Sequence, residues 1–219
     1  HARPVRAHRN HPKLRLALTA EGLAHVVEDK FFEVFNGHPT VYNDGHEDRA
    51  ESAMDRLWDI ANTIRIAELN APPLFGVGTD DSHNYHGGDV SPGRGWVMVR
   101  AEKLEPNAIV EAMQRGDFYA SSGVTLRDVR FDPTAKTLRI EIEPEEGVSY
   151  TTQFLGTRRG YDRAVEKVPA PEGDKIPFRL RYSKDVGAVL ATSDSLNPSY
   201  TLTGDELYVR AVITSSKTP

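Results

Sequence analysis

Residues 72–83, "PPLFGVGTDDSH", decide how the first half of this chain is interpreted. The stretch opens with a Pro-Pro break and continues as a short apolar run that is typical of a buried strand. It ends in two carboxylates, a serine and a histidine. In parallel β/α proteins, functional side chains gather where strands end and loops begin. The polar end of this stretch therefore predicts a functional site. The segments before and after it in the sequence indicate which chemistry that site has.

Strand-like and helix-like segments alternate around this stretch. Thr19 is a plausible helix N-cap, and a later helical segment has Pro106 in its first turn and Gly116 at its end. The resulting β-α-β-α-β order implies parallel strands joined by helical crossovers, and so an α/β fold. The strand-like segments are 3–10, 31–37, 72–79 and 96–101, and the helix-like ones are 19–30, 46–70 and 105–117.

The pattern changes near Tyr119. Apolar and polar residues then alternate in short runs, and the turn sequence "DPTAK" at 132–136 separates the first two of them. Alternation with turn signals is typical of an antiparallel sandwich. The sequence thus predicts a β/α domain over residues 1–123 and an all-β, sandwich-like domain over residues 124–219.

Composition excludes several classes of function. The chain has 219 residues, a formal net charge of −5 and no basic run, which argues against a nucleic-acid groove. It has no cysteine, so disulfides, zinc–thiolate sites and thiol catalysis are excluded. No apolar stretch is long enough to span a membrane. We expect a soluble protein, cytoplasmic or exported.

Metal-capable side chains follow three of the strand-like segments. The ends read "AHRNHP", "EVFNGH" and "TDDSH", and all 8 histidines lie at or before position 86. Oxygen and nitrogen donors without sulfur suit Zn, Mn or Fe. We expect one divalent ion held by His11, Asp81 and His83. His8 competes with His11, and Asp80 is the alternative to Asp81; Asn36 and His38 are possible additions.

These segments resemble the PHP (polymerase and histidinol phosphatase) metallohydrolases. The resemblance lies in "NHP" at 10–12, "FFEVFNGH" at 31–38 and "GTDDSH" at 78–83. It implies metal ligation by His11, Asp81 and His83, and part of a distorted seven-stranded β/α barrel. Glu33 belongs to the element that resembles the family's Glu-x-x-Asn strand near the site.

The chain also departs from the family pattern. The opening His-x-His motif and the middle His and Glu ligands of the family are absent. The resemblance therefore covers only the C-terminal half of such a barrel, with an appended all-β domain. We expect a missing N-terminal half, or a partner, to complete the fold.

The expected function is metal-dependent hydrolysis of a small anionic ester, a phosphoester first, with a carboxylic ester as an open possibility. Asp81, His83 and Glu33 are the expected catalytic residues, with Asp80 and Glu33 in supporting or proton-transfer roles. Tyr85, His86 and Arg94, in the loop that follows, are expected to contact substrate. The alternatives are a non-catalytic binding module with an incomplete metal site, and a structural, carbohydrate-associated protein.

Overall fold

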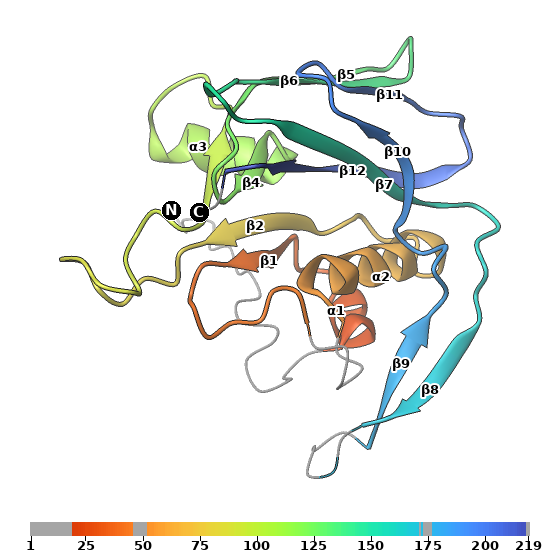
Figure 1. Ribbon diagram of the computed structural model, residues 1–219. Coiled ribbons are helices and arrows are strands. Elements are labelled where there is room, and N and C mark those ends of the chain that lie inside the picture. The colour runs from red at the N-terminus through yellow and green to blue at the C-terminus, as the bar shows by residue number, and fades with distance from the viewer. Residues whose placement is uncertain (1–18, 46–51, 171, 173–176, 218–219) are drawn as a thin grey trace. The chain divides into compact units, whose positions relative to one another are not determined.

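The computed structural model describes residues 19–45, 52–170, 172 and 177–217. The chain divides into two compact units (Figure 1). The first comprises His1–Ser122 with Ala170–Pro177, and the second comprises Gly123–Pro169 with Phe178–Pro219.

The first unit contains a β-α-β arrangement, which follows α1. β1 and β2 are parallel, from the pair Phe31–Phe75 to the pair Asn36–Thr79, and their arrows point the same way in Figure 1. The Thr19 side chain accepts a hydrogen bond from the Gly22 amide at 3.1 Å, which caps the first helix. The elements of this unit are α1 (Ala20–His25), β1 (Phe31–Asn36), α2 (Met54–Ala67), β2 (Phe75–Thr79), β3 (Trp96–Val99), α3 (Pro106–Arg115) and β4 (Phe118–Ser121).

Arg65 of α2 is the largest fully buried side chain of the described residues. Its guanidinium donates hydrogen bonds to the carbonyl oxygens of Val26, Val27, Asp29 and Pro72 at 2.7–3.1 Å. Burial lowers the pKa of this guanidinium, against the opposing charge of Asp29. The four acceptors lie in the loops that precede β1 and β2, so one side chain fixes both strand starts.

The prediction that this chain forms part of a distorted seven-stranded β/α barrel is wrong. After β2 the described chain forms no further parallel strand, and β3 and β4 pair with each other antiparallel. Of the residues that the structure describes, strands make up 37% and helices 16%, and the sheets are small. The protein is therefore β-rich.

The physical reason for this error is the position of α3. It lies between two strand-like segments, as in a parallel crossover, but Val99 pairs with Phe118 and the Arg100 amide bonds the Asp117 carbonyl at 2.8 Å. The helix is thus an excursion from a hairpin that closes at its base. Gly116, with a φ of 83°, reverses the chain at the end of the helix.

The described residues of the second unit are all β. β7 lies between β10 and β12 in one antiparallel sheet, and β6 lies between β11 and β5 in another. β8 and β9 form a separate antiparallel hairpin. The elements are β5 (Leu126–Asp132), β6 (Thr137–Ile142), β7 (Tyr150–Arg158), β8 (Val165–Pro169), β9 (Phe178–Tyr182), β10 (Ala188–Ser193), β11 (Ser199–Thr201) and β12 (Glu206–Ser215).

The two three-stranded sheets of this unit share one apolar core. Ile140 and Ile142 of β6 are buried with Tyr150 and Phe154 of β7 and with Tyr200 of β11. The rings of Phe154 and Tyr200 stack with centroids 5.6 Å apart. Side chains from both sheets therefore exclude water from the space between them.

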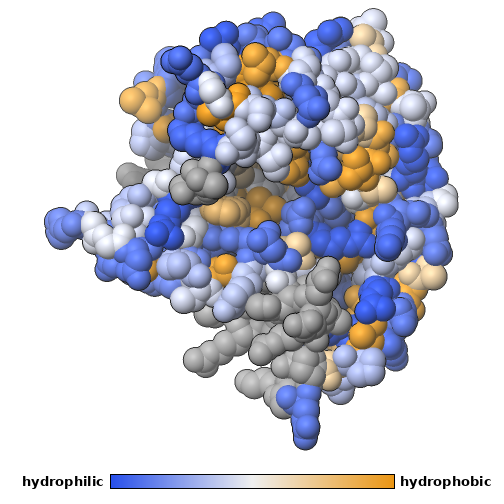
Figure 2. Space-filling view, in the orientation of Figure 1, coloured by the Kyte–Doolittle hydropathy of each residue, from blue (hydrophilic) through white to orange (hydrophobic). Residues whose placement is uncertain are grey.

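The exposed surface carries scattered apolar side chains. In Figure 2 the apolar residues of the visible face form small groups among hydrophilic ones. Tyr85 and Leu104 are the most exposed large ones of the described residues, at 76% and 96%. Across the described part of the chain, the helices lack the length and apolar character needed to cross a membrane.

Candidate functional site

The carboxyl ends of β1 and β2 bring several of the predicted site residues together. The Gly37 amide donates to the Thr79 carbonyl at 2.8 Å, so the two chains stay side by side as they leave the sheet. Asn36, the last residue of β1, and Asp81, two residues beyond β2, then meet through their side chains. Parallel pairing thus produces the shared edge that the sequence pattern predicted for these two segments.

Asp81 and His83 form the centre of this cluster. His83 Nε2 lies 3.7 Å from Asp81 Oδ1. Asp81 has a φ of 49°, a left-handed conformation that aspartate tolerates better than most residues with a Cβ. The His83 side chain is 65% exposed and that of Asp81 is 21% exposed, so the pair is open to solvent on the imidazole side.

Asn36 orients the Asp81 carboxylate. Its Nδ2 donates to Asp81 Oδ2 at 3.3 Å, which leaves the other carboxylate oxygen for the His83 side. Asn36 is 1% exposed, and its Oδ1 accepts the His38 amide at 2.8 Å. The Asn43 side chain holds the Asn36 backbone by two hydrogen bonds. Asn43 Oδ1 accepts the Asn36 amide at 3.0 Å, and Asn43 Nδ2 donates to the Asn36 carbonyl at 2.9 Å. One buried amide therefore links three segments of the site.

Glu33 lies one step deeper, inside the unit. Its side chain is almost fully buried, with 1% of the residue exposed, and its Oε1 accepts a hydrogen bond from Thr79 Oγ1 at 2.6 Å. This bond crosses from β1 to β2 just below the strand ends. It fixes the point where β2 gives way to the Asp81 loop, and the catalytic and supporting roles expected of Glu33 stay predictions.

Asp80 makes different contacts from the adjacent Asp81. Its Oδ1 accepts the backbone amides of Gly93, Arg94 and Gly95 at 2.9, 2.6 and 2.9 Å. Three successive N–H groups on one oxygen form the kind of concave anion site that backbone amides make. Here a carboxylate of the same chain occupies it, and Asp80 thereby closes the base of the loop over residues 81–92.

The predicted substrate-contact residues differ in how they are held. Arg94 Nη1 donates to the Gly37 carbonyl at 3.3 Å, so its side chain crosses from the loop to the end of β1. A Cβ on Gly37 would lie 2.6 Å from Arg94 Cβ, which explains the glycine there. Tyr85 and His86 are exposed on the loop.

The two remaining predicted histidine ligands of the first segment, His8 and His11, lie outside the described residues. His38 is described: its ring packs edge-on to the ring of His83, with centroids 5.2 Å apart. In the part of the chain that the structure describes, no group of three His, Asp or Glu side chains is placed to hold one metal ion. Of the three expected ligands, the described residues include Asp81 and His83, which lie side by side.

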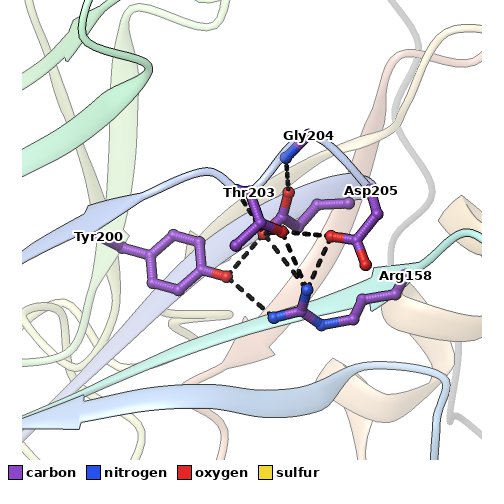
Figure 3. A network of polar contacts seen from close by, with 6 residues as sticks. Arg158, Tyr200, Thr203, Gly204 and Asp205 are labelled. Atoms are coloured by element: carbon purple, nitrogen blue, oxygen red, sulfur yellow. Dashed lines mark hydrogen bonds and ion pairs between the residues drawn. The ribbon is translucent and has the colours of Figure 1, made fainter.

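A second polar network lies in the other unit, at the turn between β11 and β12. Figure 3 shows Arg158 beside Tyr200 and Asp205. Arg158 donates to Asp205 Oδ1 at 2.7 Å and to the Tyr200 hydroxyl at 3.4 Å. Glu206, whose side chain is fully buried, accepts the Tyr200 hydroxyl at 2.7 Å and the Thr203 amide at 3.1 Å.

The ionisation of this network follows from its hydrogen bonds. Burial raises the pKa of the Glu206 carboxyl, but the bonds from Tyr200 and from the amides of Thr203 and Gly204 outweigh it and lower the pKa to about 2. Burial and the bond to Glu206 raise the pKa of the Tyr200 hydroxyl to about 12. The charged side chains of Arg158, Asp205 and Glu206 bond one another or neighbouring polar groups, so we interpret this network as one that stabilises the fold.

Sequence reasoning missed the residues that support the site. Thr79, Asn43 and Thr40 hold Glu33, Asn36 and His38, and none of them carries a pattern that distinguishes it from an ordinary polar loop residue. The Glu206 network had a weak signal in "TGDE" at 203–206, a turn sequence with hydrogen-bonding side chains.

The chain matches no protein-family model, and no curated protein or solved structure is detectably similar to it.

Proposed function

We propose that this chain carries part of the active site of a metal-dependent hydrolase, with a phosphoester as its first candidate substrate. The observation that supports this most is the Asp81–His83 pair at 3.7 Å. Two ligands of one tetrahedral Zn²⁺ at about 2.1 Å are about 3.4 Å apart. The donor atoms of the pair are therefore spaced nearly as two ligands of one ion would be.

The donor set also fits a divalent ion. One imidazole nitrogen and one carboxylate oxygen suit Zn, Mn or Fe, and Asn36 presents the carboxylate as a hydrogen-bonded outer partner does in metal sites. A divalent ion bound there supplies polarisation of the ester and activation of water at neutral pH. Further ligands are needed, and His11 stays the predicted one.

The chain's own residues would then divide the work. Asp81 and His83 hold the ion, and Asn36 keeps the Asp81 carboxylate turned towards it. Asp80 closes the loop base, so that the loop stays against the site. Arg94, tied to the Gly37 carbonyl, offers a cation beside the strand ends for an anionic substrate.

Metal binding tests this proposal directly. Chain loaded with Zn²⁺ or Mn²⁺ and then dialysed is analysed for metal content, beside Asp81→Asn and His83→Ala. Each substitution is expected to weaken binding at least ten-fold, since each removes one ligand. His25→Ala is the matched control, because His25 ends α1 and, among the described residues, its side chain bonds the Glu21 carbonyl within the same helix. Unchanged metal content in both site variants would refute the proposal.

A binding module without catalysis is the second candidate. It is favoured by the fact that the described residues bring two ligands together and not three. Hydrolysis assays separate the candidates: bis(p-nitrophenyl) phosphate tests the phosphoester, and p-nitrophenyl acetate tests the carboxylic ester. Metal binding that depends on Asp81, without turnover of either ester, would favour the binding module.

A further inference from the structure

His38 is held more tightly than an ordinary loop histidine. Its backbone amide donates to Asn36 Oδ1 at 2.8 Å, and its carbonyl accepts the Val41 amide at 3.0 Å. The ring is fixed as well: the Thr40 backbone amide donates to His38 Nδ1 at 3.2 Å, and Thr40 Oγ1 lies 2.9 Å from the same nitrogen. Both the position and the rotation of the imidazole are therefore set by the turn after β1.

The bond from Thr40 decides which tautomer is present. A nitrogen that accepts a backbone N–H must offer its lone pair, so the proton of the neutral ring is on Nε2. Among the described residues, His38 Nε2 has no hydrogen-bond partner. The side chain thus presents a fixed N–H donor that no other described residue accepts.

The ring that carries this donor lies beside the candidate site. The His38 ring packs edge-on to the His83 ring at a centroid distance of 5.2 Å and an interplanar angle of 65°. His83 in turn pairs with Asp81. A metal bond through His38 Nε2 would require the ring proton to move to Nδ1. That N–H would then point at the backbone N–H of Thr40, and two donors cannot bond each other.

We infer that His38 is a substrate-binding residue that donates its Nε2–H to an anionic oxygen of the ester, and is not a metal ligand. The inference rests on the proposed function for the identity of the ester, but the tautomer and the donor role have their own measurements. A charge-assisted bond from a preset N–H adds affinity for phosphoryl or carboxylate oxygens and costs little ordering of the side chain. His38 would then select substrates by charge beside the ligand pair.

Nitrogen NMR of the imidazoles tests the tautomer first. In the chain labelled with ¹⁵N, at a pH where His38 is neutral, Nε2 is expected to show the shift of a protonated ring nitrogen and Nδ1 that of a bare one. A proton found on Nδ1 would overturn the inference. This measurement needs no metal and no turnover, so it stands apart from the test of the proposed function.

Binding of methyl phosphate tests the donor role. His38→Ala is expected to weaken methyl phosphate binding about ten-fold while leaving Zn²⁺ content unchanged. His38→Gln, whose terminal amide places an N–H near the position of Nε2, is expected to restore much of the affinity. His38→Asn places its amide nearer Nδ1 and is expected to behave like alanine. His25→Ala is the control.

The outcomes separate this inference from the proposed function. Loss of Zn²⁺ in His38→Ala would make His38 a ligand and overturn the inference. Methyl phosphate binding that is absent, or equal in the His38 variants and the unsubstituted chain, would also overturn it. If metal binding fails but His38 still governs methyl phosphate binding, the donor role holds and the hydrolase proposal does not.

Discussion

Replacing Glu206 by glutamine should destabilise the second unit more than any exposed carboxylate substitution. Glu206 Oε1 accepts hydrogen bonds from Tyr200, from the Thr203 amide and from the Thr203 hydroxyl, and Oε2 accepts the Gly204 amide at 2.9 Å. Glutamine keeps the shape and one acceptor oxygen. Its NH₂ group, however, faces an N–H donor where the carboxylate had an oxygen, so at least one buried donor loses its partner.

The pKa of Glu206 sets the size of the effect. The native pKa is about 2, against an ordinary value of 4.5. That difference corresponds to about 3 kcal/mol of the free energy of unfolding, at about 1.4 kcal/mol per pH unit. Because the pKa is lowered in the folded state, this contribution is present above pH 4.5 and is lost as the pH falls from 4.5 towards 2. Glu206→Gln has no such carboxyl and should lack this part of the pH dependence.

Urea unfolding followed by far-UV circular dichroism at pH 7, 5 and 3 measures this effect. The gap between the unsubstituted chain and Glu206→Gln should be about 3 kcal/mol at pH 7 and should narrow at pH 3. Glu166→Gln is the control, since Glu166 is exposed and pairs with Arg181 at 3.1 Å on the surface. Its effect should stay below about 1 kcal/mol. A gap under about 1 kcal/mol for Glu206→Gln, or one independent of pH, would refute this reasoning.

Two further substitutions test the packing of each unit. Gly156→Ala should destabilise the second unit by about 1–3 kcal/mol, because the new Cβ would lie 2.3 Å from the Tyr208 carbonyl oxygen across the β7–β12 pairing. The control in the same urea experiment is Gly123→Ala, whose new Cβ would have no neighbouring atom within 4 Å. Arg65→Met should lower the thermal midpoint of the first unit, because four carbonyl groups lose a charged donor. Tryptophan fluorescence follows this transition, since both tryptophans, Trp58 and Trp96, lie in the first unit. An unchanged midpoint would show that these carbonyls find other partners.

Local patterns in the sequence determined several elements correctly. The capping Thr19 predicted the start of α1, which ends at His25 and not at residue 30 as expected. A helix over 46–70 was also predicted, and α2 lies within it, while Pro106 with Gly116 predicted both ends of α3. The short apolar runs predicted β1 and β2, because strand formation depends on residues close in the chain. Their parallel alignment was predicted from the strand-helix-strand order, because a helical crossover returns the chain in the same direction. The meeting of Asn36 with the Asp81 segment follows from that pairing alone.

Only the tertiary structure decided how α3 connects its strands and which polar residues support the site. A helix between two strand-like segments is compatible with a parallel crossover or with an excursion from a hairpin, and the pairing of Val99 with Phe118 chooses the second. The tautomer of His38 likewise depends on one backbone amide, that of Thr40. Such choices are made by hydrogen bonds whose geometry is set by the folded backbone, and residue type carries no record of them.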